Sequence, residues 1–164
     1  MTVESLRRVY LDRLAELRHG QQQLSHGLPR MAQAACSDRV SDLLGCQALC
    51  AKQNLERIEA LLAAESEVAS RARCVAARDA LKAAEVLIEE EMDLELIDAG
   101  LVEICQRAQV NTLEILRNAA DLAQALGLKP VAGALHEMRR EEEVLAARWN
   151  LLAEQYSARA AWAV

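Results

Sequence analysis

The chain has 164 residues, a formal charge of −6 and a pI near 5.2. This acidic balance argues against a nucleic-acid partner, because a protein that binds nucleic acid needs clustered Lys and Arg residues. No apolar run approaches the ~20 residues of a membrane span, and the N-terminus lacks the basic and apolar regions of a signal peptide. We therefore expect a cytoplasmic protein with one domain over residues 1–164 and no membrane contact.

The composition predicts an all-α fold. Hydrophobic residues make up 52% of the chain but aromatic residues only 2%, and Phe is absent. Leu and Ala must therefore fill the core, and both are strong helix formers, whereas the residues that strands prefer are scarce.

Turn and capping signals divide the chain into five helical segments. Ser37-Asp38 is an N-cap signal, residues 65–70 are typical of a connection, and Gly127 with Pro130 separates the last two segments. Pro29 should kink the first segment or end it near Leu28. The predicted helices span 3–36, 38–64, 70–92, 94–126 and 130–158.

Four of these segments carry an apolar stripe at steps of three and four residues, which places the stripe on one helical face. The first stripe runs from Val3 to Met31, and the second passes through Ala51, Leu55 and Ile58. Each stripe is interrupted by polar residues that should face inward. These are Gln21, Gln47, Gln109 with Thr112, and Glu142.

Several short motifs resemble those of one protein family. They are Gly27-Leu-Pro-Arg-Met-Ala32, Leu55-Glu-Arg-Ile-Glu59, Asp98-Ala-Gly-Leu-Val102 followed by Gln106-Arg107, and Ala125-Leu-Gly127. Over residues 10–150 the chain resembles the YciE/YciF-like stress-associated branch of the ferritin-like superfamily. The resemblance implies an antiparallel four-helix bundle with an additional short helix, in which inward carboxylates and His residues hold two metals.

Most of the metal ligands that this resemblance implies are replaced. The family's ligand positions fall on Gln21, Gln47, Cys50, Gln109, Val110, Asn111, Thr112 and the pair Glu141–Glu142. An iron or manganese pair needs several anionic oxygens, and Gln offers only a neutral one. We therefore expect no cofactor and a hydrogen-bonded polar layer in which Gln21, Gln47, Gln109 and Glu142 converge. A residual di-iron or di-manganese oxidase-like site is the alternative.

Two other groups of residues could bind metal. Glu16 and His19 have E-x-x-H spacing but lie off the apolar stripe, so we expect both to meet solvent. Cys46 and Cys50 lie one helical turn apart and could bind a soft cation such as copper(I). The five cysteines show no CxxC spacing, and we expect reduced, buried thiols.

The sequence favours a non-catalytic, stress-associated structural or interaction protein that acts through its folded surface. A bundle of Leu and Ala leaves apolar strips that a two-fold homodimer would cover. The C-terminal segment 158–164 is apolar, and Trp162 is the predicted docking residue. A residual metal oxidase and a thiol or soft-metal protein remain the alternatives.

Overall fold

The chain folds into four long helices and one shorter helix. The computed structural model describes residues 1–65 and 70–162, with 160–162 described by their backbone alone. The helices are α1 (Val3–Ala34), α2 (Asp38–Ala63), α3 (Val75–Glu90), α4 (Leu94–Ala125) and α5 (Lys129–Trp162). The described residues contain no strand, so the predicted all-α bundle is confirmed.

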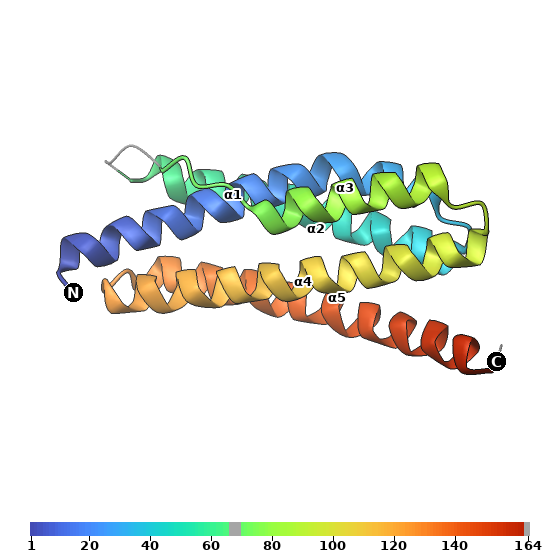
Figure 1. Cartoon of the computed structure of the whole chain (residues 1–164). Coiled ribbons are helices and arrows are strands. Elements are labelled where there is room, and N and C mark those ends of the chain that lie inside the picture. The colour runs from blue at the N-terminus through green and yellow to red at the C-terminus, as the bar shows by residue number, and fades with distance from the viewer. Residues whose placement is uncertain (66–69, 163–164) are drawn as a thin grey trace.

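The bundle is built from two antiparallel helix pairs. α1 packs against α2, α4 packs against α5, and α3 lies along both α1 and α4 (Figure 1). α2 and α5 also contact each other, over a smaller interface than any of the pairs just named. The two termini lie at opposite ends of the elongated bundle. None of the described helices is long and apolar enough to cross a membrane.

The predicted stripes form the core. Leu14, Leu44, Leu116 and Leu135 are fully or almost fully buried, together with the two large residues Tyr10 and Trp149. Removing these apolar surfaces from water is the main favourable contribution to folding. The prediction that the first stripe begins at Val3 is wrong, because that residue lies at the helix start and is exposed.

α1 continues through Pro29 to Ala34, so the helix does not end near Leu28. A proline inside a helix removes one backbone hydrogen bond and crowds the preceding turn. Leu28 and Met31 lie on either side of Pro29 and are both buried in the core. Burial of these two side chains offsets the local cost and keeps the last turns of α1 helical.

α3 begins at Val75, five residues later than predicted. The backbone N–H of Cys74 donates a hydrogen bond to Nδ1 of His19 at 2.9 Å. A Cβ at Gly20 would lie 3.2 Å from that of Cys74, so the glycine allows the segment to approach α1 closely. This contact holds residues 70–74 outside a helix. Most of the predicted connection at 65–70 lies outside the described residues.

His19 and Glu16 are both partly exposed, so each side chain meets solvent with part of its surface and packs against the protein with the rest. His19 accepts the hydrogen bond from Cys74, and Glu16 forms an ion pair with Arg13. Both residues therefore have structural partners.

Asp98 of α4 links α5 and the connection between α1 and α2 at one end of the bundle. Its buried carboxylate accepts hydrogen bonds from the backbone N–H groups of Cys36 and Ser37, at 2.8 and 2.7 Å. The Tyr156 hydroxyl of α5 donates to the same carboxylate at 3.3 Å. Asp98 of α4 thus caps the connection between α1 and α2, where two N–H groups would otherwise lack acceptors.

We expect Asp98→Ala to lower the free energy of unfolding by about 2 kcal/mol, because it leaves two partly buried N–H groups without an acceptor. The control is Asp93→Ala, which removes the exposed N-cap of α4 and should cost about 1 kcal/mol. Urea unfolding measures both changes. An Asp98→Ala variant as stable as Asp93→Ala would contradict this role.

Candidate functional site

Glu142 is a completely buried carboxylate at the centre of the bundle. Nε2 of Gln47 donates to Oε2 of Glu142 at 3.1 Å, and Nδ2 of Asn54 donates to Oε1 at 2.9 Å. Nε2 of Gln109 donates to Oε2 as well, and also to the backbone carbonyl of Glu142 at 2.9 Å. Three amide groups from α2 and α4 therefore converge on one carboxylate of α5. We call Glu142 and its three amide partners the Glu142 hub.

Two further side chains complete this polar layer. Nε1 of Trp149 donates to Oε1 of Gln47 at 3.2 Å, so both ends of that amide are engaged. The Cys50 thiol donates to Oε1 of Glu142 at 3.5 Å. Buried polar groups are tolerated when their donors and acceptors are paired, and these bonds pair the hub atoms apart from Oδ1 of Asn54, which is buried without a partner in the described part of the chain.

The predicted convergence is therefore found for Gln47, Gln109 and Glu142. Gln21 is buried as predicted, but no hydrogen bond joins it to the hub, and its Oε1 has no partner among residues 1–65 and 70–159. Thr112 is also buried, and its hydroxyl donates to the Ala108 carbonyl one turn earlier in α4. These two residues face the interior without contributing to the hub.

The acidic pair Glu141–Glu142 is split between surface and core. Glu141 is partly exposed and accepts two hydrogen bonds from the Arg57 guanidinium, at 2.8 and 3.2 Å. Val110, another position aligned with the family's ligands, is exposed on α4. Among these aligned positions, Glu142 therefore supplies the carboxylate of the layer.

Asn54 is the hub residue that the sequence prediction missed. The predicted stripe of α2 passes from Ala51 to Leu55, but Leu55 is only half-buried while Asn54 is almost fully buried. Both positions fit the helical spacing between Ala51 and Ile58, since steps of three and four are equivalent there. The prediction chose Leu55 as the inward-facing residue because it is apolar, whereas Asn54 is the residue that faces the core.

The residues of the hub do not fit a di-metal centre. Gln47, Asn54 and Gln109 direct their N–H groups at Glu142, and a cation would require oxygen atoms in those places. The remaining Gln47 oxygen already accepts from Trp149. Within the described part of the chain, no three His, Cys, Asp or Glu side chains are grouped to hold a metal ion.

The two candidate thiols differ in their surroundings. Cys46 is exposed, whereas Cys50 is half-buried beside Glu142, so the expectation of uniformly buried thiols is wrong for Cys46 and also for Cys36. Burial and the neighbouring Glu142 raise the pKa of Cys50 to about 12. Burial alone raises the pKa of Cys105 to about 12 as well. Cys50 and Cys105 are therefore poor sources of the thiolate that a soft cation prefers.

We expect iodoacetamide at pH 8 to alkylate Cys36 and Cys46 and to leave Cys50 almost unmodified, because the thiolate is the reacting form and a raised pKa suppresses it. Mass spectrometry of the native protein measures the sites, and labelling in denaturant supplies the reference for all five thiols. Equal labelling rates at Cys46 and Cys50 would contradict the inferred environment and favour the soft-metal alternative.

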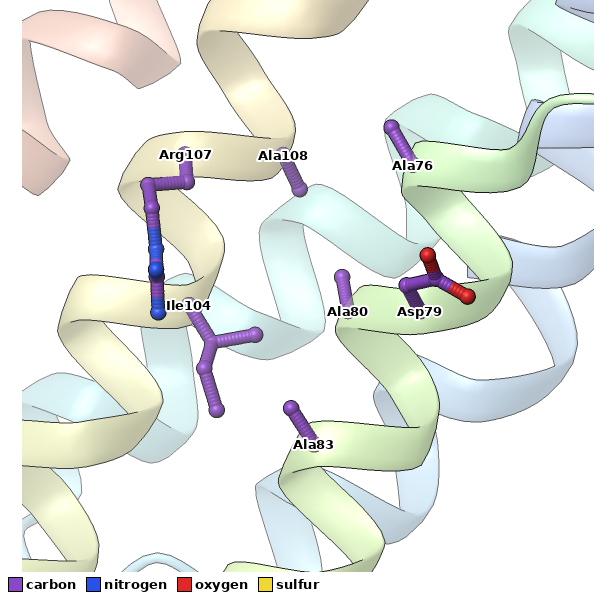
Figure 2. Close-up of a pocket in the computed structure, with 7 residues that line it drawn as sticks. All are labelled: Ala76, Asp79, Ala80, Ala83, Ile104, Arg107 and Ala108. Atoms are coloured by element: carbon purple, nitrogen blue, oxygen red, sulfur yellow. The ribbon is translucent and has the colours of Figure 1, made fainter.

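A groove of about 320 Å³ lies between α3 and α4, and no hub residue lines it. Figure 2 shows three small side chains of α3, Ala76, Ala80 and Ala83, facing Ile104 and Ala108 of α4. Two charged residues also line the groove, and each forms an ion pair within its own helix. Asp79 pairs with Arg78, and Arg107 pairs with Glu103. The groove therefore presents an apolar floor without a cluster of catalytic groups.

Comparisons with known proteins agree with the architecture. A family described as a domain of unknown function, DUF892, matches residues 5–161. Protein YciF of Escherichia coli K12 is 25% identical over 144 residues, covering 87% of each chain. The crystal structure of the E. coli stress protein YciF superposes with a TM-score of 0.85 at 24% identity, covering 96% of this chain and 98% of the other.

A second solved structure, YcfI from Rhodopseudomonas palustris, superposes with a TM-score of 0.81 at 21% identity and covers 92% of this chain and 94% of its own. These likenesses show the fold, while the family match extends over nearly the whole chain. The chain therefore belongs to the DUF892 family and is a YciE/YciF-like protein.

Proposed function

We propose that this protein is a stress-associated structural or interaction protein that acts through its folded surface and has no working di-metal centre. The observation that carries this proposal is the Glu142 hub, in which the amides of Gln47 and Gln109 occupy positions where the family resemblance implies metal ligands. Amide N–H groups stabilise a carboxylate, but they repel a cation. The hub therefore supports the bundle rather than a reaction.

The stress association is inferred from YciF, whose crystal structure is described as that of a stress protein. The free cysteines fit a reducing compartment such as the cytoplasm. A homodimer is the expected assembly, because a second copy supplies a partner for exposed apolar surface.

The test is the iron and manganese content of protein purified from supplemented medium, measured together with ferroxidase activity. We expect less than one tightly held ion per chain and no activity. Two metals per chain, both lost on Glu142→Ala, would overturn this proposal and establish the residual oxidase-like centre. Copper(I) that is retained until Cys46 and Cys50 are replaced by Ser would establish the thiol alternative.

A further inference from the structure

The connection between α3 and α4 exposes three large apolar side chains that are close together in the sequence. Met92 is 92% exposed, and Leu94 and Leu96 in the first turn of α4 are 55% and 54% exposed. This connection lies at the end of the bundle opposite the N-terminus (Figure 1). Single exposed apolar residues are common, but a group of three is typical of a binding surface. We call residues 90–96 the α3–α4 elbow.

The elbow has a defined backbone conformation although its side chains are exposed. Oε1 of Glu91 accepts hydrogen bonds from the backbone N–H groups of Met92 and Asp93, at 2.9 and 3.0 Å. Beside the elbow, Leu87 of α3 packs closely over α4, where a Cβ added at Gly100 would lie 2.4 Å from the Leu87 side chain. A partner therefore meets apolar side chains that are already positioned, which lowers the entropic cost of binding.

The apolar side chains of the elbow are surrounded by negative charge. Residues 83–106 contain no Lys, Arg or His. Glu89, just before the elbow, forms an ion pair with Arg30 of α1. Within the elbow, four acids form no ion pair with the basic side chains that the structure describes: Glu90, Glu91, Asp93 and Glu95. The elbow thus combines an apolar centre with carboxylates that are available to a cationic partner.

The position of Glu90 is not explained by helix stability. Asp93 and Glu95 lie at the start of α4, where negative charge is favourable to a helix. Glu90 is instead the last residue of α3, where the helix dipole disfavours an acid. An acid at this position is explained by an interaction with a cation outside the chain.

We propose that the α3–α4 elbow binds a basic amphipathic segment of another protein. Apolar side chains of that segment pack on Met92, Leu94 and Leu96, and its Lys or Arg residues lie beside Glu90 and Glu95. This inference rests on the proposed function, since it names the surface and the kind of partner of a protein that acts through its surface.

The charge of the elbow selects this partner over other occupants. Phosphate groups of a nucleic acid or of a lipid surface would be repelled by its carboxylates. The elbow of a second copy would be repelled as well, because two-fold symmetry sets like charges against each other. A Lys-rich or Arg-rich segment with an apolar face complements both the charge and the apolar centre of the elbow.

The probe for this surface is a fluorescein-labelled helical peptide of Leu and Lys in which the Leu residues line one face. A peptide of the same composition, with its Leu residues spread around the helix, is the control for attraction by charge alone. Fluorescence anisotropy measures binding of both peptides to the whole protein. We expect saturable binding of the amphipathic peptide, about 10-fold or more tighter than that of the control.

The first pair of variants tests the apolar centre. Leu94→Ser combined with Leu96→Ser should weaken binding of the amphipathic peptide about 10-fold or more, because it removes two of the three apolar contacts. The control combines Val110→Ser with Val144→Ser, since both valines are 64% exposed and lie outside the elbow. We expect this control to bind as the wild type does. Circular dichroism confirms that each variant is folded.

The second pair of variants tests the charge. Glu90→Gln combined with Glu95→Gln should also weaken binding about 10-fold, because it removes two carboxylates from the elbow. The control combines Glu56→Gln with Glu59→Gln, which removes the same net charge from exposed positions on α2. We expect the control to retain the affinity of the wild type.

Three results would overturn this proposal: no saturable binding of the amphipathic peptide, equal affinity for the two peptides, or equal weakening by the elbow variants and their matched controls. Each result leaves the absence of a metal centre to its own test, because metal content is measured separately. Conversely, peptide binding that is lost in both elbow variants would stand even if metals were found.

Discussion

Replacing Glu142 by Leu should lower the free energy of unfolding by about 3–5 kcal/mol. Leu fills a similar volume but accepts no hydrogen bond, so Gln47 and Asn54 each lose the carboxylate that accepts from a buried donor, and Gln109 keeps the backbone carbonyl of residue 142 as its acceptor. A buried donor left unpaired costs about 1–3 kcal/mol, partly offset here by the apolar side chain that replaces the carboxylate. Urea unfolding followed by circular dichroism measures the change.

Glu141→Leu is the matched control, because it alters the neighbouring residue on the partly exposed side of α5. Its ion pair with Arg57 lies at the surface, where such pairs contribute about 0–1 kcal/mol. If Glu142→Leu is no more destabilising than Glu141→Leu, the hub does not stabilise the bundle.

Glu142→Gln should cost less than Glu142→Leu, about 1–2 kcal/mol, because one acceptor oxygen remains. The new amide donor also has an available acceptor. Oδ1 of Asn54 is buried without a partner in the described part of the chain, and rotation of the Asn54 amide would turn this oxygen towards residue 142. We therefore expect the free energy of unfolding to rise from Glu142→Leu to Glu142→Gln and then to the wild type. This order distinguishes a hydrogen-bonding role of Glu142 from simple packing.

The helices could be predicted because local signals and core packing agree at most of their ends. Asp93 caps the start of α4 with its own side chain, and Ser37 is the N-cap residue of α2 as predicted, although its side chain makes no capping hydrogen bond. The start of α3 could not be predicted, since it depends on a hydrogen bond between Cys74 and His19, which are far apart in sequence. The passage of α1 through Pro29 likewise depends on tertiary burial.

The candidate site was only partly predictable for a related reason. Periodicity identifies which side chains point inward, and Gln47, Gln109 and Glu142 were found in this way. Periodicity does not give the relative heights of helices, so it could not show that Oε1 of Gln21 makes no hydrogen bond to the hub. It also could not choose between Asn54 and Leu55, which fit the spacing equally well.

We expect that restoring acidic and imidazole ligands creates tighter metal binding than that of the wild type. The variant combines Gln21→Glu, Gln47→His, Cys50→Glu and Gln109→Glu with the native Glu142, at positions assigned by the family resemblance. Together these changes provide four carboxylates and one imidazole, close to the usual ligand set of this bundle. We expect about two Mn²⁺ ions per chain by elemental analysis, against less than one for the wild type.

The physical reason lies in the charge of the layer. Four carboxylates in a low-dielectric interior repel one another, so the variant without metal should unfold at a lower temperature than the wild type. Divalent cations neutralise this repulsion and bind only the folded state, which adds about 2.7 kcal/mol of stability at a free concentration of 100 times Kd. The melting temperature of the variant should therefore rise with added Mn²⁺, while that of the wild type stays constant.

Adding Glu142→Ala to the same variant is the control, because it removes the native carboxylate at the centre of the layer. This control should lose most of the Mn²⁺-dependent rise in melting temperature. If the wild type gains as much from Mn²⁺ as the restored variant, then the native amides already support a metal site and the assignment of the hub as metal-free is wrong. If only the restored variant responds, replacement of anionic ligands by amides accounts for the loss of metal chemistry in this bundle.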